Sequence, residues 1–377
     1  MLERIEFSGY KAFRDLSSLE IRPITLIIGK NSSGKSSVLK LFPLLEQMLS
    51  GTLNYPLILS PKGISLGSEY NDLFYNQITS DLKIALHYSN DVKVEASYFN
   101  NVKDIGISHY SIKNGDLIKE RRLEDDKRMI RGLIDEELIS LVGIDVKELS
   151  IAVNYIGPYR IPAPHSIIFK GLDNTLSVGY DGSGAYNLLL NSYRSDKELL
   201  KQISEWMKNS LEGQYLEFNN ISNSSGTYNL FVKRNLNPTN ISGVGQGIAQ
   251  VLPIITQSFI AEPHSINVIE QPALHLHPAA HANVAYRLGL SAKERRCHYV
   301  IESHSENVLL GFRHMIVNPD VDFGPEDIVV YFVDNDGETA MLKEITIDSE
   351  GELSDWPTGV FGEGFELLRE INQMRSR

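Results

Sequence analysis

The segment from Gly29 to Ser36 carries the residue types that hold a chain of phosphates. It reads GKNSSGKS, so that two glycines, a lysine and a hydroxyl residue stand at the spacing G-x-x-x-x-G-K-S. Backbone N–H groups of such a loop wrap phosphate oxygens, and the positive end of the following helix adds to the attraction. Glycines are needed because the backbone must approach the ligand closely. The motif therefore predicts bound ATP, with Lys35 on the β- and γ-phosphates and Ser36 on Mg²⁺.

A glycine-rich segment and two polar strand ends follow much later in the chain. Residues 242–247 precede a helical stretch at 248–259, Glu270 ends an apolar strand, and His304 follows another strand in the sequence Glu-Ser-His-Ser. A GTPase would need an Asn-Lys-x-Asp tetrapeptide, which the chain lacks. The order of phosphate loop, glycine-rich segment, strand-end acid and strand-end histidine resembles the ATP-binding cassette (ABC) class.

This resemblance implies a role for each of these residues. Glu270 would coordinate Mg²⁺ together with Ser36. Gln271 stands where a carboxylate usually orients the attacking water, and it can position water although it cannot accept a proton. His304 would contact the γ-phosphate. The glycine-rich segment would close over the γ-phosphate held by a second copy, so that the complete site forms only in a dimer. Its predicted contacts are Ser242, Gly243, Gly245, Gln246 and Gly247.

Two other clusters of polar residues could be interpreted as metal-binding sites. His275, His277 and His281 form an H-x-H-x3-H pattern, which allows a metal site, although no cysteine and no dedicated acid accompany them. We favour a loop that follows Glu270 and presses against the dimer partner. Asp334-Asn335-Asp336 is similar to the acids of a topoisomerase-primase nuclease, but only about forty residues follow, so an Asp-Gly hairpin turn is favoured.

The elements around the phosphate loop fit its task. Residues 24–28 form a continuous apolar run, as expected for a strand buried on both faces. Apolar residues from Val38 to Leu45 then recur at helical spacing. The loop thus joins a buried strand to a helix N-terminus, the context that the motif requires. The residues predicted to contact the nucleotide here are Gly29, Lys30, Asn31, Ser32, Ser33, Gly34, Lys35, Ser36 and Ser37.

Hydrophobic periodicity predicts the other elements. Ser195 to Glu198 has the spacing of a capping box that opens a helix with Ile203, Trp206, Met207 and Leu211 on one face. The remaining predictions are strands at 2–8 and 19–28, antiparallel strands within 80–118 with a turn at 89–91, a helix at 120–142, a strand and proline-rich turn at 151–165, a hairpin at 328–347 and a short helix in the tail.

Composition narrows the class of protein. The chain has 377 residues, 42% of them hydrophobic, and a formal net charge of −12, which argues against a broad basic surface on duplex DNA. No apolar run approaches the roughly 20 residues of a membrane-spanning helix. The N-terminus does not read as a signal peptide, and Cys297 is the only cysteine. We expect a cytoplasmic protein.

We expect an α/β fold built as an ABC-type P-loop ATPase head. It would combine a mixed sheet, flanking helices and an antiparallel β subdomain with an α/β insertion, and no heptad series predicts a coiled coil. The predicted parts are residues 1–80 and 232–345 as the two portions of the ATPase core, 81–231 as an inserted region, and 346–377 as a C-terminal tail.

The chain resembles a bacterial family of stand-alone ATPases related to recombination and chromosome-maintenance (SMC-like) ATPases and to the ATPase half of overcoming-lysogenization-defect nucleases. The resemblance covers both ends well and the middle poorly. It rests on residues 5–13, 29–37, 155–160, 245–253, 269–278 and 302–305, and residues 351–357 match a C-terminal segment of unknown function that is common in the family.

Two departures from the family pattern bear on catalysis. The family usually has Glu at the position of Ala273 and tolerates Gln at that of Gln271, so this chain lacks both carboxylates after Glu270. Ala249 stands where Ser is common. Turnover would then be slow, and ATP would act mainly as a dimerising ligand.

The resemblance implies an ATP-dependent dimer that senses or scaffolds for a separate nuclease or toxin in phage defence. A module that binds ATP without turning it over is the second hypothesis, and a repair or recombination ATPase acting on DNA is the third. A transporter ATPase is disfavoured, because about 200 residues separate the phosphate loop from the glycine-rich segment.

Overall fold

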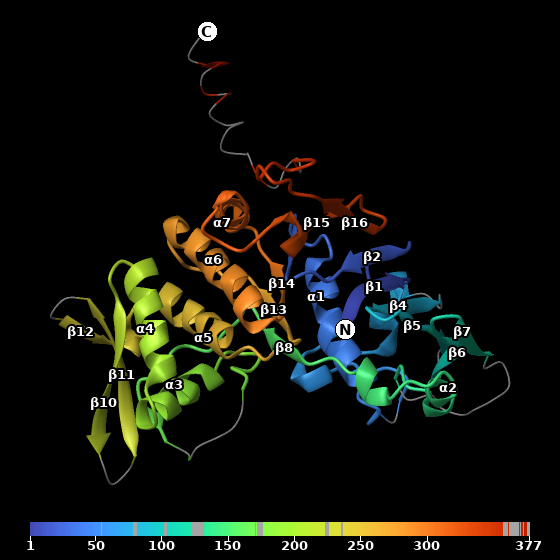
Figure 1. Cartoon of the computed structure of the whole chain (residues 1–377), viewed down its shortest axis with the longest axis horizontal. Helices are drawn as coiled ribbons and strands as arrows, with labels where there is room; N and C mark the ends of the chain where they lie inside the picture. Colours follow the sequence, from blue (N-terminus) through green and yellow to red (C-terminus); the bar gives the residue numbers. More distant parts are fainter. Residues whose placement is uncertain are drawn as a thin grey trace. The chain divides into compact units, whose positions relative to one another are not determined.

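The chain divides into two compact units, each of which is described by itself (Figure 1). Unit 1 comprises Met1–Val153, Pro325–Asp348 and Glu352–Arg377, and unit 2 comprises Asn154–Gly324 and Ser349–Gly351. The computed structural model describes residues 1–53, 55–77, 81–101, 104–122, 132–169, 171, 176–222, 226–234, 237–356, 361, 369, 371, 373 and 374.

Unit 1 contains an antiparallel sheet with the strand order β2-β1-β4-β5-β6-β7. Alternate residues of β1, such as Ile5 and Phe7, are fully buried, as the period of a strand requires. The predicted turn at 89–91 joins β4 to β5. The strands are β1 (Leu2–Ser8), β2 (Ser17–Glu20), β4 (Leu82–Tyr88), β5 (Val92–Asn101), β6 (Asp104–Asn114) and β7 (Leu117–Arg122).

The phosphate loop lies in the other sheet region of unit 1. Every residue of β3 (Ile24–Gly29) is buried, and β3 runs parallel to β15 (Ile328–Asn335). Strand β15 pairs in turn with antiparallel β16 (Ala340–Ile345), which confirms the predicted hairpin and makes this sheet mixed. Helix α1 (Lys35–Met48) follows the loop, and α2 (Glu136–Leu141) also belongs to unit 1.

Unit 2 places the strand-end residues on a pair of parallel strands. Strands β13 (Ile266–Glu270) and β14 (His298–Glu302) are buried at every position and pair in register. Strand β8 (Val153–Ile156) is the other neighbour of β13. The helices that follow these elements in sequence are α5 (Gln246–Ile260), α6 (Pro278–Arg295) and α7 (Glu306–Val317).

A second, antiparallel sheet completes unit 2, in which β11 pairs with β9, β10 and β12. Helices α3 and α4 lie between this sheet and α5 (Figure 1), and α4 packs on β10. These elements are α3 (Gly184–Arg194), α4 (Glu198–Ser210), β9 (Ile167–Ile168), β10 (Tyr215–Ser222), β11 (Thr227–Arg234) and β12 (Asn237–Asn240). The predicted α/β class, with a mixed sheet, flanking helices and an antiparallel β region, is confirmed.

Three local predictions were wrong. Residues 19–28 form two strands instead of one, because Pro23 has no N–H for the ladder and β2 ends before it. The predicted helix at 120–142 begins as the end of β7, continues through residues outside those described, and reaches α2 only at Glu136. The capping box fails because Ser195 caps the end of α3, where its hydroxyl donates to the carbonyl of Asn191, and Lys197 caps α4.

The predicted tail helix lies largely outside the described residues. The longest described helix, α6, has 18 residues. No described helix combines the length and apolar character needed to cross a bilayer.

Candidate functional site

The loop of unit 1 joins the end of β3 at Gly29 to the start of α1 at Lys35. Gly34 caps α1 in a positive-φ conformation, no side chain caps the helix, and its first turn holds no acidic residue. The first N–H groups of a helix have no intrahelical partner, and its N-terminus attracts anions. The first turn of α1 therefore carries no carboxylate that would compete with a phosphate group for this helix end.

Two glycines of the loop meet both a conformational and a steric requirement. Gly29 has φ +152, and a Cβ atom there would lie 2.4 Å from the carbonyl oxygen of Val333. Gly34 has φ +114, and a Cβ atom there would lie 3.2 Å from the ring of Phe13. Neither position accepts an L side chain without movement of the neighbouring atoms. The motif's glycines are thus explained by the geometry of the loop.

Lys35 and Ser33 turn polar atoms into the loop. Lys35 is only 4% exposed, and its Nζ donates a 2.6 Å hydrogen bond to the carbonyl oxygen of Lys30. The Oγ atom of Ser33 is buried and has no hydrogen-bond partner among the described residues. Because an unsatisfied buried hydroxyl costs roughly 1–3 kcal/mol, it fits a ligand atom that completes its bonding. The donors of the loop therefore suit a phosphate chain.

The other residues predicted for this loop are more open. Lys30, Asn31 and Ser32 are exposed, and Ser32 has φ +61. Ser36 and Ser37 are half-buried in the first turn of α1.

Glu270 and Gln271 stand at the end of β13 in unit 2. Glu270 is opposite Glu302 in the parallel register, and each is 4% exposed. The N–H of Gln271 donates a 2.9 Å hydrogen bond to the carbonyl oxygen of Glu302, and its φ is +51. The chain therefore leaves β13 through Gln271, the residue predicted to position water, which has a left-handed backbone conformation.

Two residues to which the sequence gave no role hold this strand end. The hydroxyl of Tyr155 donates a 2.5 Å hydrogen bond to Oε1 of Glu270. Burial, and then the Glu270 carboxylate, raise the pKa of Tyr155, so the hydroxyl keeps its proton. The guanidinium of Arg160 donates to the carbonyl oxygens of Glu270 and Gln271. Burial lowers the pKa of Arg160 to about 10, although the Glu270 carboxylate opposes this change.

His304 follows β14 and is exposed. Its Nε2 lies 3.8 Å from Oε1 of Glu302, with 34% of the histidine side chain accessible. The Oγ of Ser303 accepts a 3.0 Å hydrogen bond from the N–H of Ser305, which shapes the turn into α7. The histidine ring thus stands beside the acid that pairs with Glu270.

The glycine-rich segment forms a short 3-10 turn and the start of α5. The side-chain oxygen of Asn240 accepts hydrogen bonds of 3.0 Å and 2.8 Å from the N–H and hydroxyl of Ser242. Gly245 caps α5, and nothing lies within 4 Å of a Cβ atom built there. Helix α5 begins at Gln246, two residues before the predicted start at 248. Gly243 and Gln246 are exposed, so the segment presents backbone to its surroundings.

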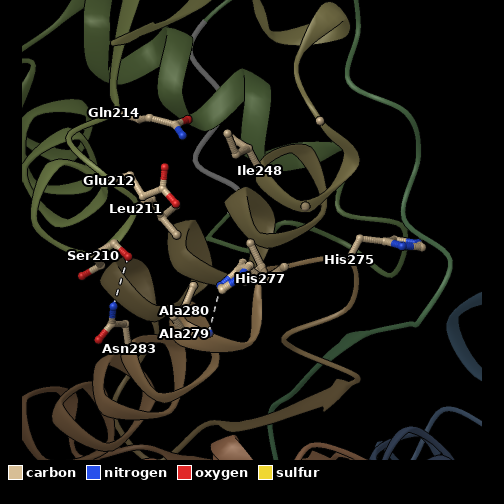
Figure 2. Close-up of a pocket in the computed structure, with 13 residues that line it drawn as sticks. Ser210, Leu211, Glu212, Gln214, Ile248, His275, His277, Ala279, Ala280 and Asn283 are labelled. Carbon is tan, nitrogen blue, oxygen red and sulfur yellow. Dashed lines mark hydrogen bonds between the residues drawn. The ribbon is translucent and has the colours of Figure 1, made fainter. Parts of the chain in front are cut away.

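Gly247 is a point of close contact with the loop after Glu270. A Cβ atom at Gly247 would lie 2.5 Å from the carbonyl oxygen of His275. A pocket of about 290 Å³ lies beside this contact (Figure 2), and its lining includes Gly245, Gly247 and Ile248 as well as Ala279 and Ala280 at the start of α6. The glycine-rich segment and the loop after Glu270 thus line one hollow.

Two histidines of the H-x-H-x3-H pattern, His277 and His281, have different partners. Nδ1 of His277 accepts a 3.3 Å hydrogen bond from the N–H of Ala279 and so caps α6. The ring of His281 lies 2.7 Å from the hydroxyl of Ser305 and 3.1 Å from the carbonyl oxygen of Leu276. Within the described ranges, no three His, Cys, Asp or Glu side chains form a group that could hold a metal.

The donors expected for Mg²⁺ suit its chemistry. This ion keeps several waters and uses one or two carboxylates with the phosphates of its nucleotide. The buried carboxylate of Glu270 and the hydroxyl of Ser36 are donors of that kind. The predicted residues fall into two sets, one in each unit: 29–37 in unit 1, and 242–247, Glu270, Gln271 and His304 in unit 2.

Comparison with known families gives two matches. Residues 24–311 match a family described as "AAA domain, putative AbiEii toxin, Type IV TA system". Residues 324–371 match a family described as a protein of unknown function. None of the curated proteins compared matches the chain.

Solved structures show similarity in fold. The crystal structure of an SmcHead bound to the C-winged helix domain of ScpA aligns with a TM-score of 0.53 at 13% identity, covering 92% of this chain and 98% of that one. An SMC head domain from Thermotoga maritima gives 0.47 at 11% identity, covering 92% and 99%. An Smc head domain bound to the C-terminal domain of ScpA derived from Pyrococcus furiosus gives 0.49 at 13%, covering 98% and 99%. The first alignment confirms the predicted ATPase-head fold.

Proposed function

This chain belongs to the family of AAA domains that carries the AbiEii toxin description, and on that premise we propose that it binds ATP with Mg²⁺ on residues 29–37 and hydrolyses it slowly as an ATP-dependent dimer. The observation that carries the proposal is the buried Lys35, held inside a loop whose glycines leave no room for side chains. A buried lysine at an uncapped helix N-terminus matches the chemistry of a phosphate chain.

The two sets of residues have different proposed roles. Lys35 binds the β- and γ-phosphates, and Ser36 and Glu270 hold Mg²⁺. Bound Mg²⁺ would stabilise the charge that develops on the phosphates. Gln271 positions the attacking water and His304 contacts the γ-phosphate. The buried Glu270, which Tyr155 of β8 contacts, and the exposed ring of His304 beside Glu302 support these roles.

Slow turnover follows from the residues after Glu270. Gln271 cannot accept a proton, and Ala273 is 6% exposed and carries no polar atom on its side chain. The same observation favours a second candidate function, a module that binds ATP without turning it over. Multiple turnovers by the isolated, purified chain would exclude this second function.

The dimer is proposed from the start of α5. Gly245 leaves its surroundings open, and the first turn of α5 has no acidic residue to repel a phosphate. The segment 242–247 of one copy would therefore cover the γ-phosphate bound by the other copy. An isologous dimer of this kind carries two equivalent sites.

We place the dimer as the sensor or scaffold subunit of a cytoplasmic anti-phage defence complex with a separate nuclease or toxin. The family description names a toxin of a type IV toxin–antitoxin system, which supports a defence role that depends on a partner. The SmcHead structure contains a bound partner domain, which supports partner binding by a head of this fold. Direct action on DNA is the alternative, and the net charge of −12 counts against it.

Sedimentation and mixing experiments test the proposed dimer. With ATP and Mg²⁺ the wild-type chain should sediment as a dimer, and Gly245→Asp, which adds a negative charge at the start of α5, should remain a monomer. Lys35→Ala and Gly245→Asp should each lose hydrolysis alone and regain part of it when mixed, because a mixed dimer contains one intact site. A wild-type chain that hydrolyses ATP while remaining a monomer at every ATP concentration would rule out this arrangement.

A further inference from the structure

The hydroxyl of Tyr155 fixes the carboxylate that we propose as a Mg²⁺ ligand. Its 2.5 Å hydrogen bond to Oε1 of Glu270 is buried. The Tyr155 ring stacks on Tyr180, with centroids 5.6 Å apart and an interplanar angle of 26°. A stacked, buried ring has little rotational freedom, so the hydroxyl position is set by packing. The orientation of the Glu270 carboxylate is therefore set from β8.

Arg160 ties the same strand end to the helix that begins with the glycine-rich segment. Its guanidinium donates to the carbonyl oxygens of Glu270 and Gln271 and, at 3.3 Å, to that of Gln250 in α5. The side-chain amide of Gln250 donates a 3.2 Å hydrogen bond back to the carbonyl oxygen of Arg160. A planar fork of donors can hold several carbonyls at once in fixed geometry. Helix α5 and the end of β13 are thus joined through one side chain.

The backbone that Arg160 holds is conformationally strained. Gln271 has φ +51, and a left-handed conformation is unfavourable for a residue with a side chain. The N–H of Gln271 is held by the carbonyl oxygen of Glu302, and its own carbonyl by Arg160 at 3.2 Å. Strained residues persist where their surroundings over-determine them. These two contacts therefore hold the Gln271 backbone in its left-handed conformation.

Arg160 also occupies an unusual environment for a cation. It is 5% exposed, and its Nε is buried without a hydrogen-bond partner among the described residues. Its described side-chain hydrogen bonds go to backbone carbonyls, so backbone dipoles stabilise its charge together with the Glu270 carboxylate. Burying a charge in this way is costly, which favours a role beyond packing.

We propose that the segment 155–160 positions the hydrolytic residues of this protein, with Tyr155 orienting the Glu270 carboxylate and Arg160 coupling the Glu270–Gln271 backbone to helix α5. This inference rests on the proposed function. Both are positioning residues, because they act through Glu270 and Gln271. A shift of α5 when its N-terminus meets a second copy would reach Gln271 through Arg160, so that dimerisation and hydrolysis are linked.

Tyr155→Phe tests whether Tyr155 orients the Glu270 carboxylate, because it removes the hydroxyl and keeps the stacked ring. The Mg²⁺ concentration for half-maximal hydrolysis should rise about tenfold, as expected when a partner of a metal ligand is lost. Binding of Mn²⁺ to the ATP-loaded chain, followed by electron paramagnetic resonance, should weaken by a similar factor. ATP affinity in EDTA should not change. Tyr180→Phe, which alters the other ring of the stack, is the matched control and should leave the metal dependence at its wild-type value.

Arg160→Lys tests the coupling role of Arg160. It keeps the positive charge and removes the planar guanidinium that contacts several carbonyls at once. We expect kcat to fall at least about tenfold with little change in KM for ATP, because positioning of the hydrolytic group is lost and nucleotide binding is not. ATP-dependent dimerisation should persist. The control is Arg194→Lys, an arginine of the same unit that lies 4.0 Å over the ring of Phe169 and should affect stability alone.

The outcomes separate this proposal from the proposed function. A wild-type chain that does not bind ATP would refute the proposed function itself. An ATP-binding Tyr155→Phe chain with wild-type Mn²⁺ affinity would overturn the positioning role of Tyr155. A folded Arg160→Lys chain with wild-type kcat would overturn the coupling role. If Arg160→Lys does not fold, Arg160→Gln, which keeps two amide donors, replaces it with the same expected fall in kcat.

Discussion

The ammonium group of Lys35 donates a 2.6 Å hydrogen bond to the carbonyl oxygen of Lys30, so the phosphate loop closes around its own lysine. A carbonyl is a neutral acceptor, and a phosphate oxygen is a stronger, charge-assisted one. The loop is therefore shaped without a nucleotide, and on the proposed function ATP binding would exchange one acceptor of Lys35 for a better one. Preorganisation of this kind reduces the ordering cost of binding.

Gly29→Ala should weaken nucleotide binding with only a modest effect on folding. The added Cβ atom would lie 2.4 Å from the carbonyl oxygen of Val333, so β3 and the loop must move apart from β15. We expect ATP affinity, measured by isothermal titration calorimetry, to fall at least about tenfold, because the backbone can no longer approach the phosphates. Gly51→Ala is the control, because it shares a positive φ and has nothing within 4 Å. Equal affinities of wild type and Gly29→Ala would contradict this account of the loop.

Ser33→Ala should separate stability from nucleotide binding. The Oγ of Ser33 is buried without a hydrogen-bond partner among the described residues, so its removal relieves a desolvation cost. The free energy of unfolding without nucleotide should stay the same or rise by about 1 kcal/mol in urea titrations. The increase in Tm caused by MgATP should become smaller. A clear loss of stability in the nucleotide-free protein would show that this hydroxyl has a partner in the folded chain.

The buried thiol of Cys297 should lower the free energy of unfolding as the pH becomes alkaline. Burial raises the pKa of its thiol from 9.0 to about 11. Between these values the unfolded chain loses the proton and the folded chain keeps it. The stabilisation is therefore complete below pH 9 and is lost as pH rises through about 11. From pH 9 to 10.5 the free energy of unfolding should fall by about 1–2 kcal/mol more in wild type than in Cys297→Ala. An equal fall in the free energy of unfolding of the two chains across this range would contradict the assignment.

The same burial predicts the reactivity of this thiol. A thiol reagent at pH 8 should leave Cys297 unmodified in the folded chain, because the thiolate is the reactive form. It should react at once in 6 M guanidinium chloride. Rapid modification of the native chain would show that the residue is accessible.

The phosphate loop could be predicted from sequence because its requirements are local. Gly29 and Gly34 take conformations that few other residues accept, and those requirements act within a few positions of the chain. Glu270 could be placed at a strand end for a similar reason, since it directly follows the apolar Val268 and Ile269 of β13. The roles of Tyr155 and Arg160 could not be derived, because they depend on β8 lying beside β13, and β8 lies more than 100 residues earlier in the chain.

The errors have equally specific causes. Ser195 has the spacing of a helix cap, but α3 ends one residue before it and takes its hydroxyl. The charged end of β7 lies at the edge of its sheet and is largely exposed, so it shows none of the alternation that marks a half-buried strand. His275, His277 and His281 have metal-site spacing, but α6 begins at Pro278, so His277 caps the helix and His281 lies within it.

The central claim, that residues 29–37 hold the ATP that this chain cleaves, is tested most directly by the hydrolysis rate of wild type against Lys35→Ala. The substitution should reduce the rate about 100-fold, because it removes the charge that stabilises the transferring phosphate, while the Tm without nucleotide changes little. Lys40→Ala, which removes a lysine of the same helix whose Nζ donates to the carbonyl of Ser65, should retain the wild-type rate. Equal hydrolysis by wild type and Lys35→Ala would contradict the account.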